Sequence, residues 1–154
     1  MTINRTRSGV GLPADFPFSL AGEAYGLCFI SGMCALDPDG TFVPGTFEEE
    51  TEPAWHNVAA IAEASGCSID DIVYVQCLLS DIDNYGDLNA WWRRHFPDIS
   101  TAPARFTFQA GALPFGAKIE IQAIAARGNR VRRTPVMRVE ATQLTRSHPA
   151  FCGT

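Results

Sequence analysis

The sequence lacks the features that mark a membrane, exported or metal-binding protein. Its longest apolar stretches, such as Ile72–Leu79, are far shorter than the ~20 residues that cross a bilayer. The start, MTINRTRSGVG, has no apolar signal core, so we expect neither a membrane span nor an export signal. The histidines His56, His95 and His148 form no H-E-x-x-H or similar ligand pair, and we therefore expect no metal.

Disulfide and nucleophile motifs are missing as well. The cysteines are Cys28, Cys34, Cys67, Cys77 and Cys152. Their odd number and the absence of C-x-x-C spacing argue against a disulfide framework and a structural zinc site, and favour a reducing cytoplasm. No serine or cysteine lies in a nucleophile motif such as G-x-S-x-G, so covalent catalysis has no support. We expect no redox cofactor.

The composition is that of one globular domain. The chain has 154 residues, of which 46% are apolar and 19% charged, and a mean hydropathy of -0.01. Residues 1–126 carry six basic and 16 acidic side chains, a formal charge of -10, whereas residues 127–154 carry six arginines and one glutamate, or +5. We expect a domain at 1–127 and a basic extension at 128–154. The acidic body disfavours nucleic-acid binding, unless the tail alone makes the contact.

The first half of the sequence predicts a hairpin followed by a helix. Apolar runs at 17–22 and 25–31 read as two strands joined by residues 22–24, and the residues at 37–40 form a turn. Thr46 and Glu49 have capping-box spacing, and Pro53 is tolerated in a first helical turn. A buried helical stripe is expected from residues at helical spacing, with Gly66 as the stop: Trp55, Val58, Ala59 and Ala62.

The second half predicts a strand, a helix and two more strands. Residues 72–79 have no polar face, as expected of a central strand covered on both sides. Asp83 or Asn84 caps the second helix, which ends at Pro97. The expected stripe of this helix is Tyr85, Leu88, Trp92 and Phe96. Strands at 105–110 and 118–126 complete an α+β fold with two helices on one sheet face, and residues 136–144 of the tail suit a further strand.

Alternation along the last two strands selects two candidate residues. Ile119, Ile121 and Ala123 share one face, which the helices should cover, while Glu120 points the other way. Arg105 points opposite Phe106 in the same manner. If the two strands lie close in the sheet, Arg105 and Glu120 share one cleft, where a guanidinium binds a carboxylate and a glutamate holds water. On spacing alone, a structural salt bridge is the simpler interpretation.

Other candidates have simpler structural explanations. Ser31-Gly32 ends a strand, where glycine lets backbone amides approach a ligand, although such a pair is most often a turn. Cys34 follows closely, and a small buried thiol is the simpler interpretation. The segment 91–96, WWRRHF, has the aromatic and basic residues that stack on bases, but a core stripe with a solvated edge explains it.

Several motifs occur together in a characteristic order over residues 17–127. They are Phe29-Ile30-Ser31-Gly32, Asp37-Pro38-Asp39-Gly40, His56-Asn57-Val58, Ala64-Ser65-Gly66, Val75–Asp81, Asn89, Pro103-Ala104-Arg105, Leu113-Pro114 and Ile119–Ala125. The sequence resembles the RidA/YjgF family of reactive-intermediate deaminases. That resemblance implies a chorismate-mutase-like mixed sheet, a homotrimer built around a central barrel, and sites in the clefts between subunits.

The resemblance also implies a reaction, the hydrolysis of enamine or imine acids such as 2-aminoacrylate to 2-oxo acids and ammonia. Arg105 then binds the substrate carboxylate and Glu120 orients the water. Further substrate contacts are expected at positions matching family site residues, namely Phe18, Ser31, Gly32, Asn89 and Thr107. The partner is a small carboxylate, with no cofactor, metal, membrane or nucleic acid.

Three positions depart from the family pattern. Phe18 replaces a common tyrosine, Thr107 a common cysteine and Glu50 a common glutamine. They leave open a specialisation for bulkier or more apolar acids. They also leave open a trimer that binds 2-oxo acids without turnover. An RNA-cleaving or translation-inhibiting role ranks last, because the body is acidic and no histidine pair is present.

Overall fold

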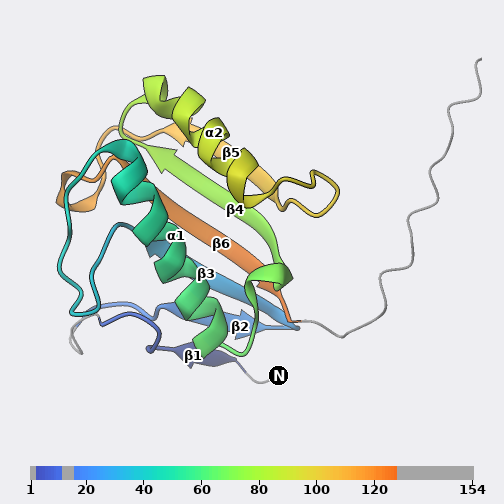
Figure 1. Cartoon of the computed structure of the whole chain (residues 1–154). Coiled ribbons are helices and arrows are strands. Elements are labelled where there is room, and N and C mark those ends of the chain that lie inside the picture. Colours follow the sequence, from blue (N-terminus) through green and yellow to red (C-terminus); the bar gives the residue numbers. More distant parts are fainter. Residues whose placement is uncertain (1–2, 12–15, 128–154) are drawn as a thin grey trace, which may run out of the picture.

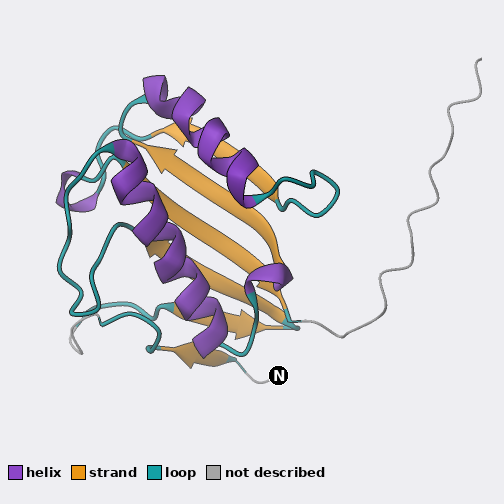
Figure 2. Cartoon of the chain, in the orientation of Figure 1, coloured by secondary structure: helices purple, strands orange, loops and turns teal. Residues whose placement is uncertain are grey.

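The computed structural model describes residues 3–11 and 16–127, which form an α+β structure. A six-stranded sheet has the strand order β1-β2-β3-β6-β4-β5, and both α-helices of this part of the chain lie on one of its faces (Figures 1 and 2). The predicted α+β class, with a mixed sheet and two helices on one face, is therefore confirmed, while the trimeric barrel stays a prediction. The basic extension at 128–154, with its predicted strand at 136–144, lies outside the described residues. Among the described residues no helix is long and apolar enough to span a membrane.

The strand order places β4 between β5 and β6. The strands are β1 (Asn4–Thr6), β2 (Ala21–Ala24), β3 (Leu27–Met33), β4 (Ile72–Leu79), β5 (Ala104–Gln109) and β6 (Ile119–Ala126). All neighbours pair antiparallel except β4 and β5, which are parallel and joined through α2. The last two strands of the chain are therefore not neighbours in the sheet.

The predicted hairpin exists, but its turn lies further along the chain. Ala24 pairs with Leu27, so the loop is Tyr25-Gly26 rather than residues 22–24. Both loop residues have positive φ, 54° for Tyr25 and 77° for Gly26, as in the type I′ turns that match strand twist. Tyrosine is unusual in that conformation, which explains why the sequence pattern misplaced the turn. The short strand β1 at the sheet edge was not predicted.

Helix α1 (Phe47–Ala64) begins and ends at the predicted signals. The Thr46 hydroxyl accepts from the Glu49 amide, and the Glu49 carboxylate accepts from the Thr46 amide, which completes the capping box. At the other end Gly66 has a φ of 74°, and Cys67 donates to the carbonyl of Ala62 in a Schellman arrangement. Pro53 lies beyond the first turn, where it was not expected.

Helix α2 (Tyr85–His95) follows a short 3₁₀ turn, Ile82–Asn84, and buries a different face from the one predicted. Leu88 and Trp91 are its fully buried residues, whereas Tyr85 is exposed and Trp92 half-buried. The predicted stripe combined two faces of this helix. Further 3₁₀ turns lie at Ile69–Asp71 and Pro114–Gly116.

The main core fills the helix-covered face of the sheet, and a small second cluster of Cys34, Leu113 and Ala117 packs against Leu78. Ile119 and Ile121 of β6 are buried there, as the alternation predicted, together with Val75 of β4. On the opposite face Phe29 is 45% exposed and Phe106 51% exposed. The expectation that β4 is covered on both sides is therefore not met within one chain. A sheet face with exposed aromatic side chains is typical of an interaction surface.

The two helices are joined by Glu52 of α1. Its carboxylate accepts a 2.7 Å hydrogen bond from the Trp91 indole and lies 3.2 Å from both His95 and His56. Partial burial acts to raise the pKa of Glu52, but the hydrogen bonds from Trp91 and His95 and the two histidine charges lower it overall. The ionised carboxylate thus holds the end of α2 against α1.

We predict that Glu52→Gln lowers the melting temperature in a pH-dependent manner. A depressed folded-state pKa stabilises the fold above the unfolded-state pKa, and this contribution is lost as the pH falls through the folded value. The difference from the wild type should be fully present above about pH 5 and should shrink as the pH falls below the ordinary glutamate pKa of about 4.3 toward the lower folded-state value. Thermal unfolding across this range tests it, with Glu63→Gln at an exposed position of α1 as control. A difference that is constant with pH would contradict the ionic role.

Candidate functional site

Arg105 and Glu120 lie on opposite faces of the sheet. Arg105 is in register with Val75, which is buried beneath the helices, so its side chain points to the helix side. Glu120 is in register with Leu78, one of the β4 residues that alternate with the buried ones, and points to the open face. The expectation of one shared cleft is therefore wrong within a single chain. Its stated condition fails because β4 separates β5 from β6.

The surroundings of Arg105 come from one side of α2. The guanidinium donates from Nη2 to Oδ1 of Asn89. Its central carbon lies 4.8 Å from the ring centroid of Trp92 and 5.6 Å from that of Tyr85. Positions 85, 89 and 92 recur at helical spacing, so one helical face orients the cation through a hydrogen bond and two aromatic rings.

Two buried polar atoms, one in the guanidinium and one next to it on β5, have no hydrogen-bonding partner among the described residues. They are Nη1 of Arg105 and Oγ1 of Thr107, both buried. Arg105 and Thr107 are two apart on β5 and therefore point to the same side. Unpaired buried polar atoms are costly and rare, so a small ligand with acceptor oxygens suits this place. We call Arg105, Thr107, Asn89, Trp92 and Tyr85 the arginine half-site.

On the open face, a β-bulge shapes the surroundings of Glu120. The register shifts from Ile30–Ala123 to Met33–Ile121, so Ser31 and Gly32 of β3 together lie opposite the single residue Gln122 of β6. A Cβ atom at Gly32 would lie 1.9 Å from Oε1 of Glu120, so only glycine leaves room for the carboxylate in this conformation. Ser31 fixes the bulge by donating through its hydroxyl to the carbonyl of Ser19 at 2.9 Å.

Glu120 opens into a cavity of about 320 Å³. The residues that line it are Phe18, Ser31, Gly32, Leu78, Glu120 and Gln122. Burial raises the pKa of Glu120, and no hydrogen bond or neighbouring charge contributes to that shift. A carboxylate with a raised pKa is a stronger base than an ordinary one, so it is better able to take a proton from water and return it. We call these lining residues the glutamate half-site.

The structure thus gathers the predicted site residues into two groups rather than one. Arg105, Asn89 and Thr107 lie in the arginine half-site, and Glu120, Ser31, Gly32 and Phe18 in the glutamate half-site. Sequence reasoning missed Tyr85 and Trp92 as partners of Arg105, and Leu78 and Gln122 as cavity walls. The spacing of Tyr85, Asn89 and Trp92 was the available signal, because it defines a helical face distinct from the buried one.

Cys34 and Glu50 lie near this region without the properties of reacting groups. Burial, followed by the nearby charges of Glu120 and Glu50, raises the pKa of Cys34 to about 12, so it stays a thiol. Glu50 is fully buried and accepts from the backbone amide and the Nζ of Lys118, at 2.7 and 3.0 Å. Glu50 therefore anchors α1 to the start of β6.

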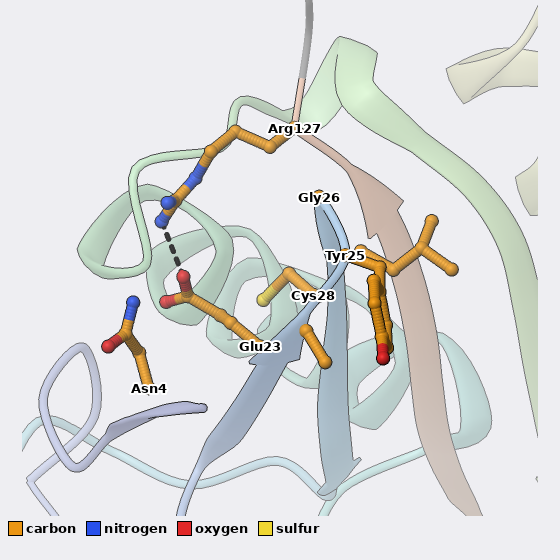
Figure 3. Close-up of a pocket in the computed structure, with 8 residues that line it drawn as sticks. Asn4, Glu23, Tyr25, Gly26, Cys28 and Arg127 are labelled. Atoms are coloured by element: carbon orange, nitrogen blue, oxygen red, sulfur yellow. Dashed lines mark hydrogen bonds and ion pairs between the residues drawn. The ribbon is translucent and has the colours of Figure 1, made fainter. Parts of the chain in front are cut away.

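A small pocket of about 90 Å³ lies at the C-terminal end of β6, beside the β2–β3 turn (Figure 3). The contacts of its side chains hold the fold together. Arg127 lies 2.6 Å from the Glu23 carboxylate, and it also donates to the carbonyl of Ser65. These contacts join β2, the end of β6 and the end of α1. Among the described residues no cluster of three or more His, Cys, Asp or Glu side chains is arranged to hold a metal.

Taken together, the structure is an α+β domain with a half-buried arginine on the helix side of its sheet and a half-buried glutamate in a cavity on the open face. The family model described as Endoribonuclease L-PSP matches residues 11–127. The mouse protein named 2-iminobutanoate/2-iminopropanoate deaminase is 37% identical over 113 residues, which are 73% of this chain and 82% of that protein.

Solved structures agree with this match. The crystal structure of yeast Mmf1 has a TM-score of 0.75 at 29% identity, and the alignment covers 82% of this chain and 100% of that chain. The Escherichia coli YjgF gene product gives 0.72 at 29% identity, with 81% and 100% covered. The chain belongs to the RidA/YjgF family, to which the Endoribonuclease L-PSP model corresponds.

We predict that Gly32→Ala lowers the pKa of Glu120 without unfolding the sheet. The added methyl group displaces the end of a flexible side chain, and the carboxylate moves into a better solvated position. Carbon-13 NMR titration of the Glu120 carboxyl group measures the change. Gly22→Ala is the matched control, because a Cβ there meets no atom within 4 Å. An unaltered Glu120 pKa in Gly32→Ala, or an equal shift in the control, would contradict this geometry.

Proposed function

We propose that the protein is a hydrolytic deaminase that converts small enamine and imine acids of the 2-aminoacrylate type to 2-oxo acids and ammonia. The observation that carries this proposal is the pair of incomplete half-sites. One offers a buried guanidinium nitrogen without a partner, and the other a carboxylate whose pKa is raised by burial. The deaminase name of the mouse relative supports the same reaction class.

The two half-sites complete each other only between neighbouring subunits, so the proposal includes an oligomer. When the helix side of one β5 meets the open face of the next chain, each Arg105 faces the partner subunit's Glu120. A cyclic arrangement repeats this contact without leaving a half-site unused. The family resemblance implies three subunits, and the exposed side chains of Leu27, Phe29 and Phe106 on the open face suit burial in such an assembly.

In the proposed reaction, binding of the carboxylate positions the substrate. The planar guanidinium of Arg105 receives the substrate carboxylate, and Thr107 supplies a further hydrogen-bonding group at the same side of β5. Asn89 and the ring of Trp92 keep the guanidinium from rotating away. The imine carbon next to the carboxylate is thereby directed toward the opposing glutamate half-site.

Glu120 accepts a proton from the water and then returns it. An enamine acid first takes a proton from solvent at its terminal carbon and becomes the iminium ion. Water then forms a C–O bond to the iminium carbon while Glu120 accepts a proton from it. That proton passes to the nitrogen, the C–N bond breaks and ammonia leaves, and the hydroxyl group gives its proton back to solvent as the carbonyl forms. Since an iminium carbon is already electrophilic, positioning supplies most of the acceleration and no strong base is needed.

Two other functions are compatible with parts of the structure. A trimer that only binds 2-oxo acids needs the arginine half-site but releases no ammonia above the uncatalysed rate. RNA cleavage, which the description of the family model names, is disfavoured by the charge of -10 over residues 1–126. We also propose a cytoplasmic location, with which the free thiols of Cys28, Cys34, Cys67 and Cys77 are compatible.

We predict that Arg105→Lys lowers kcat/KM for 2-aminoacrylate roughly 30- to 1000-fold, which corresponds to a lost bidentate contact of about 2–4 kcal/mol. Lysine keeps the charge, but an ammonium cannot make the two parallel hydrogen bonds. The assay is ammonia release from enzymatically generated 2-aminoacrylate. Arg94→Lys, in an exposed ion pair with Glu48, is the control. Near wild-type kinetics for Arg105→Lys would show that Arg105 acts only in structure or long-range charge.

We predict that Glu120→Gln lowers kcat while 2-oxo-acid affinity and melting temperature stay close to the wild type. The amide keeps the shape but can neither take nor return a proton, so only the transition state loses an interaction. Steady-state kinetics, calorimetric binding and thermal unfolding on this one variant test the role. An unchanged kcat rejects it, and a parallel fall of all three quantities indicates a structural residue instead.

A further inference from the structure

A second cavity lies directly beside Arg105, between α2 and the segment that leads into β5. Its volume is about 790 Å³, and Asn89 and Arg105 are among its lining residues. In Figure 1 the loop after α2 projects beyond the end of the helix before the chain returns to β5. The apolar wall consists of Trp92, Phe96, Pro97, Ile99, Ala102 and Pro103. We call this space the side-chain cavity.

The wall of the side-chain cavity is aromatic at its base and apolar at its rim. The rings of Trp92 and Phe96 lie 4.6 Å apart and form one surface, and Trp92 also contacts the guanidinium of Arg105. Ile99 at the rim is 89% exposed. A ligand held by Arg105 that extended over these side chains would remove apolar surface from water on both partners.

The size of the cavity exceeds what the smallest imine acids need. A cavity of about 150 Å³ already holds a benzene molecule in another protein. The reacting carbon of 2-aminoacrylate carries only a methylene group, which leaves most of the space unused. A phenyl or branched aliphatic group on the same carbon reaches from the carboxylate on Arg105 toward Trp92, Phe96 and Ile99.

We propose that the side-chain cavity is a specificity subsite and that the preferred substrates are 2-imino acids with aromatic or branched apolar side chains. This inference rests on the proposed deaminase function. Arg93 also lines the cavity, so an acidic side chain is the competing ligand chemistry. The apolar wall is the larger part of the lining and favours the apolar class. A segment of a neighbouring subunit is the competing occupant.

The test compares imine acids that an L-amino-acid oxidase generates from alanine, leucine, phenylalanine and glutamate. For the wild type we expect kcat/KM to be at least ~10-fold higher for the phenylalanine and leucine imines than for the alanine imine. Ala102→Phe fills the cavity and should lower kcat/KM for the phenylalanine imine at least ~10-fold, with the alanine imine changed less than about twofold. Ile99→Ser should lower the phenylalanine rate about threefold to tenfold, against Ile69→Ser as a distant exposed control.

The outcomes separate this inference from the proposed function. No ammonia above the uncatalysed rate from any imine would overturn the deaminase proposal itself. Activity on the alanine imine without a preference for apolar side chains, or with a preference for the glutamate imine, would overturn the subsite alone. If Ala102→Phe loses all activity, the Ile99→Ser variant decides whether the subsite exists. The quantity to compare is then its kcat/KM for the phenylalanine imine divided by its kcat/KM for the alanine imine. If Ala102→Phe no longer forms the oligomer and the Ile99→Ser variant keeps the wild-type ratio, a segment of a neighbouring subunit fills the cavity. That result would overturn the subsite.

Discussion

The insertion of β4 between β5 and β6 is the constraint on which the whole arrangement depends. Side chains alternate across a sheet, and the register through Val75 and Leu78 therefore puts Arg105 and Glu120 on opposite faces. One chain thus displays a cation under its helices and a carboxylate on its open face. Arg105 keeps a nitrogen without a partner, burial raises the pKa of Glu120, and a chemistry that needs both groups needs more than one chain.

Each half-site has its own local support. The arginine half-site depends on α2, which is itself held against α1 by Glu52, so the contact between the helices indirectly orients the guanidinium. The glutamate half-site depends on the β-bulge, where the missing side chain of Gly32 gives the carboxylate its place and partial burial raises its pKa. These supports act within each chain, before any assembly.

The features that sequence predicted well were local. The capping box at Thr46, the glycine stop at Gly66 and the limits of β4 all follow from short-range chemistry. The turn at Tyr25-Gly26 was missed because tyrosine rarely adopts positive φ. Alternation gave the relative directions of neighbours within each strand. It could not give strand order, which depends on contacts between distant segments, and so the two candidate residues were expected to share one cleft if their strands lay close.

The central claim is that a working site joins Arg105 of one chain to the glutamate half-site of another. Mixing Arg105→Lys and Glu120→Gln chains, each nearly inactive alone, tests it after unfolding and refolding together. In random cyclic trimers every mixed assembly regains one site with both native residues, so about a quarter of the wild-type activity per chain should return. Native mass measurement confirms that the assemblies are mixed. No recovery in mixed assemblies would contradict a site shared between subunits.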